Sequence, residues 1–154
     1  MKNIFEAVSI GNCEMLLECL DKGVDINLRD KDKRTPLINA AIDNHIEIAK
    51  LLLERGAEIN CQDFVGYTAL HYSAQNYFVE MVKILLDRKA AVDIQDIHGN
   101  SPLFRAVFYS KGKGEIIQLL LAKGADKDLK NKHGVSPYLL ATNIGNYNVK
   151  QYFA

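Results

Sequence analysis

Cysteine is scarce in this chain of 154 residues, and its few positions form no covalent or metal-binding pattern. Cys13, Cys19 and Cys61 are odd in number and lack the paired spacing of a zinc site. Free cysteine is one of the most commonly buried residue types, so we interpret all three as buried thiols in a reducing compartment. We therefore expect a cytoplasmic location and no metal site.

An excess of either charge is also missing. Lys plus Arg and Asp plus Glu both number 19, so the chain as a whole has no basic surplus with which to hold nucleic acid or an anionic membrane. Residues 1–77 hold 8 basic and 12 acidic side chains, a net charge of −4, whereas residues 78–154 hold 11 and 7, a net charge of +4. We expect an electrically polarised molecule whose charged binding surfaces are local. Nucleic-acid binding by the positive half is left open as a weaker alternative.

Long apolar runs are missing as well. No stretch reaches the roughly 18 residues that a membrane-spanning helix requires. The N-terminal segment has Glu6 within its apolar run and no small-residue cleavage site after a long apolar core, so it does not fit a signal peptide. With 48% hydrophobic and 25% charged residues, the composition is typical of a soluble folded chain, and we expect no membrane contact.

The chain contains instead an internal repeat that can be followed in two registers. In each register the first three members are 33 residues apart, and the fourth follows after 35. Two registers that agree independently indicate a repeating structural unit. Their members are Thr35, Thr68, Ser101 and Ser136 in the first register, and Gly23, Gly56, Lys89 and Gly124 in the second.

The first register suits the start of a helix. A Thr or Ser hydroxyl accepts a hydrogen bond from a free amide of the first turn, and a proline directly after it has no N–H to lose. Proline follows three of the four residues, and small residues such as Ala40 and Ala74 come next, which would let neighbouring helices approach closely. A second helix then carries large apolar residues, for example Ile48 and Leu52. The prolines are Pro36, Pro102 and Pro137.

The second register suits the end of that second helix, where glycine adopts a left-handed backbone easily. Lys89 stands where the other units have glycine. We expect it to be left-handed and to cost about 1 kcal/mol of stability there.

The repeated segments carry a known signature. Its first part, T-P-L-H-x-A, is written here as "RTPLINAA", "YTALHYSA", "NSPLFRAV" and "VSPYLLAT", and its second part as "LLERGAEIN", "LLDRKAAVD" and "LLAKGADKD". Over essentially its whole length the chain resembles the ankyrin-repeat family. The resemblance implies an all-α ankyrin-repeat solenoid of about five helix-turn-helix repeats with short β-turn fingers.

We expect residues 1–154 to form a single domain. The first repeat begins at Lys2, already on its helix-start position, and the last ends inside its second helix, so we expect capping repeats and a complete protein. The two extra residues lie in "FYSKGKGEII" and should lengthen the turn between the two helices of the fourth repeat. The repeats are expected at approximately 1–29, 30–62, 63–95, 96–130 and 131–154.

The residues that could take part in catalysis or ligand binding form no recognisable site. The segment "SKGKGE" at 110–115 lacks the spacing of a phosphate loop and follows a helix, so we interpret it as a solvated turn. The four histidines form no pair with metal-ligand spacing. His71 occupies the histidine position of the repeat signature, where a structural hydrogen bond is favoured, and Cys61 has no local catalytic signature. We expect no enzymatic activity, no catalytic residue and no cofactor.

The turn tips are the variable part of each repeat. They read "DKDKR" at 30–34, "DFVGY" at 63–67, "DIHGN" at 96–100 and "NKHGV" at 131–135. The resemblance implies that the tips and the exposed side of the inner helices line a concave face that binds other proteins. Exposed aromatic residues are frequent energetic anchors of interfaces, although these could instead stack on neighbouring turns. The predicted protein-binding residues are Arg34, Phe64, Tyr67, Gln75, Asn76, Ile97, His98, Asn100, Phe108 and Tyr109.

Two functions fit such a surface. The first is a protein-binding module that acts by occupying its partner. A looser likeness to small stand-alone bacterial ankyrin proteins of the toxin-immunity type implies a toxin or effector enzyme as that partner. The alternative is a scaffold, or a host-directed effector that recruits a eukaryotic protein. We expect the chain to be a monomer outside its complex, and the 108–114 loop competes with the concave face as the main contact.

Overall fold

The computed structural model describes residues 3–154, which form nine α-helices, one 3₁₀ helix and no strand. In chain order the elements are α1 (Ile4–Ser9), α2 (Cys13–Asp21), α3 (Pro36–Ile42), α4 (Ile46–Glu54), α5 (Ala69–Gln75), α6 (Val79–Asp87), α7 (Pro102–Phe108), α8 (Glu115–Ala122), α9 (Pro137–Asn143) and η1 (Val149–Phe153).

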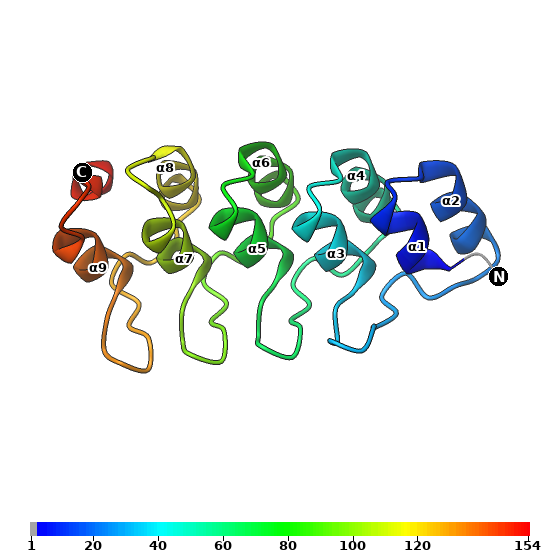
Figure 1. The fold of residues 1–154 in the computed structure, drawn as a ribbon, viewed down its shortest axis with the longest axis horizontal. Coiled ribbons are helices and arrows are strands. Elements are labelled where there is room, and N and C mark those ends of the chain that lie inside the picture. Colours follow the sequence, from blue (N-terminus) through cyan, green and yellow to red (C-terminus); the bar gives the residue numbers. More distant parts are fainter. Residues whose placement is uncertain (1–2) are drawn as a thin grey trace.

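The helices stack as antiparallel pairs along one axis (Figure 1). Helices α1, α3, α5, α7 and α9 contact one another in sequence and form an inner row. Helices α2, α4, α6 and α8, followed by η1, form an outer row, which lies above the inner row in Figure 1. Long loops project from the inner row on one side and connect each pair to the next. This arrangement confirms the predicted ankyrin solenoid.

The predicted helix starts are confirmed. The hydroxyl of Thr35 accepts from the amide of Ile38 at 3.3 Å, and the other three members of the register cap α5, α7 and α9 in the same way. The prolines open α3, α7 and α9. Because each cap lies on the loop that precedes its helix, the register fixes where α3, α5, α7 and α9 begin.

Small residues separate the inner helices, whereas large apolar residues fill the space between the two rows. Ala40, Ala74 and Ala106 are fully buried on the inner row, and Leu52 and Leu85 are fully buried on the outer row. An alanine at the helix contact allows the backbones to approach, and the large aliphatic side chains stabilise the stack by burying apolar surface away from water. The core is therefore continuous along the stack.

The helix ends of the outer row differ in one residue. The backbone of Gly56 is left-handed, with a φ of 87°, and Lys89 adopts the same conformation, with a φ of 63°. A Cβ placed on Gly56 would have no heavy atom within 4 Å, so the cost of lysine at this position comes from its backbone and not from crowding. The predicted left-handed backbone of Lys89 is confirmed.

The two ends depart slightly from the regular unit. The expected helix start at Lys2 lies outside the described residues, and within them the side chain of Asn3 caps α1 by accepting from the amide of Phe5 at 2.9 Å. The last unit has a 3₁₀ helix where the others have an α-helix. The loop of residues 109–114 is longer than its counterparts, as predicted. Tyr152 of η1 fastens it by donating from its hydroxyl to the carbonyl of Gly112 at 3.0 Å.

Candidate protein-binding surface

Each projecting loop carries a finger at residues 30–34, 63–67, 96–100 or 131–135, and all four are built in the same way. The first residue is Asp or Asn, and its Oδ1 accepts from the amides two and four positions later. In the second finger, for example, Asp63 accepts from Val65 at 3.0 Å and from Tyr67 at 2.9 Å. The side chain thus closes the turn without using the residues at the tip. The closing residues are Asp30, Asp63, Asp96 and Asn131.

Backbone hydrogen bonds join neighbouring fingers. The amide of Phe64 donates to the carbonyl of Asp32 at 3.1 Å, and that of Ile97 donates to Val65 at 3.1 Å. The fingers come so close that a Cβ on Gly66, whose φ is 79°, would lie 2.9 Å from the Cα of Asp96. The fingers are therefore a rigid array and not independent loops.

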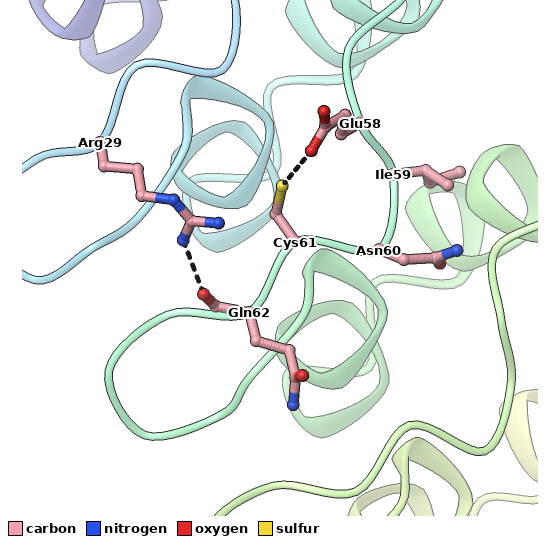
Figure 2. A pocket seen from close by; sticks show the side chains of 6 residues that line it. All are labelled: Arg29, Glu58, Ile59, Asn60, Cys61 and Gln62. Carbon is pink, nitrogen blue, oxygen red and sulfur yellow. Dashed lines mark hydrogen bonds between the residues drawn. The ribbon is translucent and has the colours of Figure 1, made fainter.

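A polar ladder on the connecting segments reinforces the array. The guanidinium of Arg29 donates to the carbonyl of Gln62 at 2.8 Å, and the Gln62 amide donates to the carbonyl of Gln95 at 3.1 Å. Figure 2 shows Arg29 and Gln62 beside an open groove of about 660 Å³. Cys61 lies in this groove with its thiol donating to Glu58 at 3.3 Å. Burial, and then this hydrogen bond, raise the pKa of the Cys61 thiol, which disfavours a nucleophilic thiolate.

A buried carboxylate supports the second finger from below. Asp63 has a side chain that is 0% exposed, and it accepts from the hydroxyl of Tyr72 on α5 at 2.6 Å. Arg34 of the first finger donates to the same hydroxyl at 3.3 Å and lies 3.7 Å from Asp63. Burial, followed by the bond to Asp63, raises the pKa of Tyr72 to about 12, so the hydroxyl remains a donor.

The third finger repeats this arrangement with different residues. Arg105 of α7 pairs with the buried Asp96 at 2.6 Å and lies over the ring of Tyr67, 5.0 Å from its centroid. Tyr67 stacks on His71 with the ring centroids 5.2 Å apart and donates to Gln75 at 3.2 Å. Burial raises the pKa of Tyr67 to about 12. Tyr67 thus links its finger to the inner row.

His71 has the structural role that was predicted. One ring nitrogen accepts from the amide of Thr68 at 3.1 Å, which completes a capping box at the start of α5. The other contacts the carbonyl of Asn100 in the next finger at 3.0 Å. Burial lowers the pKa of His71 to about 4, so the ring is neutral at physiological pH.

The predicted binding residues fall into two groups. Phe64, Ile97, Phe108 and Tyr109 have exposed fractions of 59%, 46%, 57% and 41%, and Asn76 and His98 are also exposed. Arg34, Gln75 and Tyr67 are half-buried within the network just described. Asn100 is 7% exposed, and its side chain accepts from Asn131 at 2.8 Å. The exposed group presents the larger apolar surface to a partner.

Phe64 and Ile97 belong to adjacent fingers, whereas Asn76 and Tyr109 line a separate cleft. Gln75 and Asn76 at the end of α5, together with Tyr109 and Lys111 of the lengthened loop, line a cleft of about 330 Å³. Gln75 also accepts from Tyr67, so a hydrogen bond joins the wall of the cleft to the second finger. We call this whole surface the finger face: the fingers, the inner-row side chains that contact them, and the loop of residues 109–114.

Sequence reasoning missed the residues that support the fingers and those that complete the cleft. A signal for the first kind was present, because Asn39, Tyr72 and Arg105 each follow the closing aspartate by nine positions and each contacts it. Lys111 and Lys113 lie in the 108–114 loop that was predicted as a possible contact, whereas no comparable signal identified Tyr77; all three line the cleft.

Other kinds of site find little support. Among residues 3–154, no group of three or more His, Cys, Asp or Glu side chains is arranged to hold a metal ion. Within the same range, no helix is long and apolar enough to cross a bilayer.

The structure defines a class of protein: stacked helical hairpins that hold exposed side chains on a preformed array of fingers. A family model described as ankyrin repeats (3 copies) matches residues 4–96 and 55–131, which is more than half of the chain. The chain therefore belongs to the ankyrin-repeat family, whose repeats are protein-binding modules. Comparison with curated proteins gave no match.

Proposed function

We propose that this protein binds a single partner protein through its finger face and acts by covering that partner's functional surface. The partner under this proposal is a toxin enzyme whose active cleft is occluded, as in an immunity protein. The looser likeness of the chain to small bacterial ankyrin proteins supports this choice of partner.

The observation that carries the proposal is the exposure of large apolar side chains on a rigid frame. Phe64, Ile97 and Phe108 lie outside the hydrophobic core cluster, and each is about half exposed or more. The fingers are closed by aspartate and backbone hydrogen bonds, which need no aromatic or branched residue at the tip. Exposed apolar residues that the fold does not use are available to anchor an interface.

The frame also favours tight binding. Binding orders flexible loops at a cost, and a surface that is already ordered avoids much of it. Here the fingers are fixed to one another and to the inner helices before any partner arrives, for example through Tyr72 and Arg105. A preformed surface suits occlusion of a cleft, because loops that became ordered only on binding would lose conformational entropy and weaken the complex.

Affinity capture from the native organism, followed by mass spectrometry, tests the proposal. We expect one dominant partner with an enzymatic domain, and we expect the purified chain to inhibit that enzyme at a one-to-one ratio. A gene for a nuclease or another toxin beside the gene for this chain would agree with that result. Capture of a eukaryotic regulatory protein whose activity is unchanged would favour the scaffold or effector instead.

A further inference from the structure

The charges of the outer row pair with one another across neighbouring units. Arg55 lies 3.5 Å from Asp21, Arg88 lies 3.9 Å from Glu54, and Lys123 lies 3.8 Å from Asp87. Each pair joins one outer helix end to the next. Opposite charges in these pairs neutralise each other, so they contribute little to the electrostatic potential of the outer row.

Two acids of the finger face are buried, whereas several of its lysines are exposed. Asp63 and Asp96 are buried beneath it and paired with Arg34 and Arg105. Several exposed lysines lie above, and within residues 3–154 none of them forms an ion pair. These lysines are Lys31 and Lys33 of the first finger, Lys111 and Lys113 of the lengthened loop, and Lys132 of the last finger.

Two of these exposed lysines lie at the cleft. Lys113 has its ammonium group 5.5 Å from the ring centroid of Tyr77, at the cleft wall, and Lys111 also lines the cleft. In the preceding unit the exposed Asp43 stands 33 residues before Asn76, so the equivalent position there carries a negative charge.

The cleft offers hydrogen-bond donors as well as charge. The cleft is lined by Gln75, Asn76, Tyr109 and Ser110, whose side chains carry amide or hydroxyl donors, beside Lys111. A carboxylate accepts hydrogen bonds without donating any, so such a lining suits it. The volume of about 330 Å³ fits one side chain or a short segment of a partner.

The lengthened loop is held in place by the end of the chain. Tyr152 bonds the carbonyl of Gly112, and its ring occupies the space where a Cβ on Gly114 would lie. Phe108 and Tyr109 meet edge to face at 5.0 Å beside the cleft. An apolar surface thus adjoins a positively charged pocket on a fixed support.

We propose that the cleft between α5 and the lengthened loop receives an acidic side chain of the partner protein, with an adjacent apolar partner residue lying on Phe108 and Tyr109. This inference rests on the proposed function and specifies the partner's chemistry: a surface rich in Asp or Glu next to an aromatic or aliphatic residue. Charge complementarity of this kind mainly steers encounter and selects partners.

Nuclear magnetic resonance titration of the ¹⁵N-labelled chain tests the proposal with defined probes. One probe is an acetylated and amidated hexapeptide that alternates glutamate with phenylalanine, and its control replaces every glutamate with glutamine. We expect the acidic peptide to shift the signals of Gly112, Lys113 and the Asn76 side-chain amide, and to bind at least about tenfold more tightly than its control. We expect the affinity to fall as salt is added.

Two matched protein variants complete the test. Lys111→Glu with Lys113→Glu should abolish the response, whereas Lys22→Glu with Lys89→Glu, on the outer row, should retain it. Equal binding of the glutamine peptide, or an unchanged response of the Lys111 and Lys113 variant, would overturn the acidic cleft. Tighter binding of an oligouridine hexamer would overturn it in favour of nucleic acid.

Failure of this inference is distinguishable from failure of the proposed function. If neither peptide shifts the cleft signals, the acidic cleft is rejected, while loss of the captured partner on substitution of Phe64 and Ile97 would still uphold binding by the finger face. If those substitutions also leave capture intact, the proposed surface is wrong as well.

Discussion

The outer row and the finger face follow the same period but use it differently. On the outer row the recurring residues are helix ends and ion pairs such as Arg55 with Asp21, which lie at the surface and repeat one function. On the finger face the recurring residues are the Asp or Asn side chains that close the fingers, of which Asp63 and Asp96 are buried, and the residues at the tips differ from finger to finger. The outer row thus repeats residues that are exposed at its surface, whereas the finger face repeats only the residues that hold its fingers closed.

This difference shows how a repeat protein can vary without losing its fold. The side chain of Asp63 holds its finger through bonds to backbone amides, so Phe64 can be replaced without loss of the turn. The next finger carries Ile97 at the same position on an equivalent aspartate. Separation of frame and tip leaves the tips free to specialise.

The largest expected effect is at the contact between fingers. Gly66→Val should lower the free energy of unfolding by about 3 kcal/mol, because its positive φ is strained for valine and its Cβ would meet the backbone of Asp96. Gly134→Val is the matched control, with a φ of 75° and nothing within 4 Å of a Cβ, and it should lose only about half as much. Urea unfolding measures both, and equal losses would show that the fingers do not need their close contact.

The frame beneath the finger face should respond to acid through His71. Its folded-state pKa of about 4 lies below the ordinary value of 6.5, so protonation favours the unfolded chain, and stability is lost as the pH falls from 6.5 towards 4. Between about pH 7.5 and pH 5 we expect the free energy of unfolding of the unmodified protein to fall by about 2 kcal/mol more than that of the His71→Gln variant. Urea unfolding at several pH values gives both curves, and parallel curves would mean that the ring is not buried neutral.

The tips should matter for binding and not for folding. Phe64→Ala with Ile97→Ala should weaken binding to the captured partner by more than about tenfold, which corresponds to about 1.5 kcal/mol, at nearly unchanged thermal stability. Tyr67 is left intact, because its contacts with His71 and Arg105 would confound the result. Leu28→Ala, at an exposed position before the first finger, is the control for calorimetric titration. Unchanged affinity would move the interface to the lengthened loop.

The smallest effect is expected on the outer row. Lys89→Gly should raise the free energy of unfolding by up to about 1 kcal/mol and increase the melting temperature by a few degrees, because glycine removes the strain of the left-handed backbone. Lys22→Gly, at a helix-end position with a φ of −81°, should instead lower the free energy of unfolding. A decrease for Lys89→Gly would mean that the lysine side chain contributes more than its backbone costs.

Much of the fold could be predicted because each local rule acts within a few residues. Thr35 caps the helix that begins directly after it, and Gly56 ends the one before it. The same reasoning identified His71 as structural and the loop after α7 as lengthened. The exposed tip residues Phe64 and Ile97 were also identified, because a finger that is closed by its aspartate leaves the next residue exposed to solvent.

The amino-acid sequence by itself determined the repeat, the helix boundaries and the residues at the finger tips, since capping and turn geometry are local. Only the tertiary structure decided which polar residues lie together. Arg34 meets Tyr72, and Gln75 meets Lys111 across a cleft, because helices from successive units are brought side by side. Those contacts depend on how far one hairpin is displaced from the next, a distance set by the packing of small residues between the inner helices.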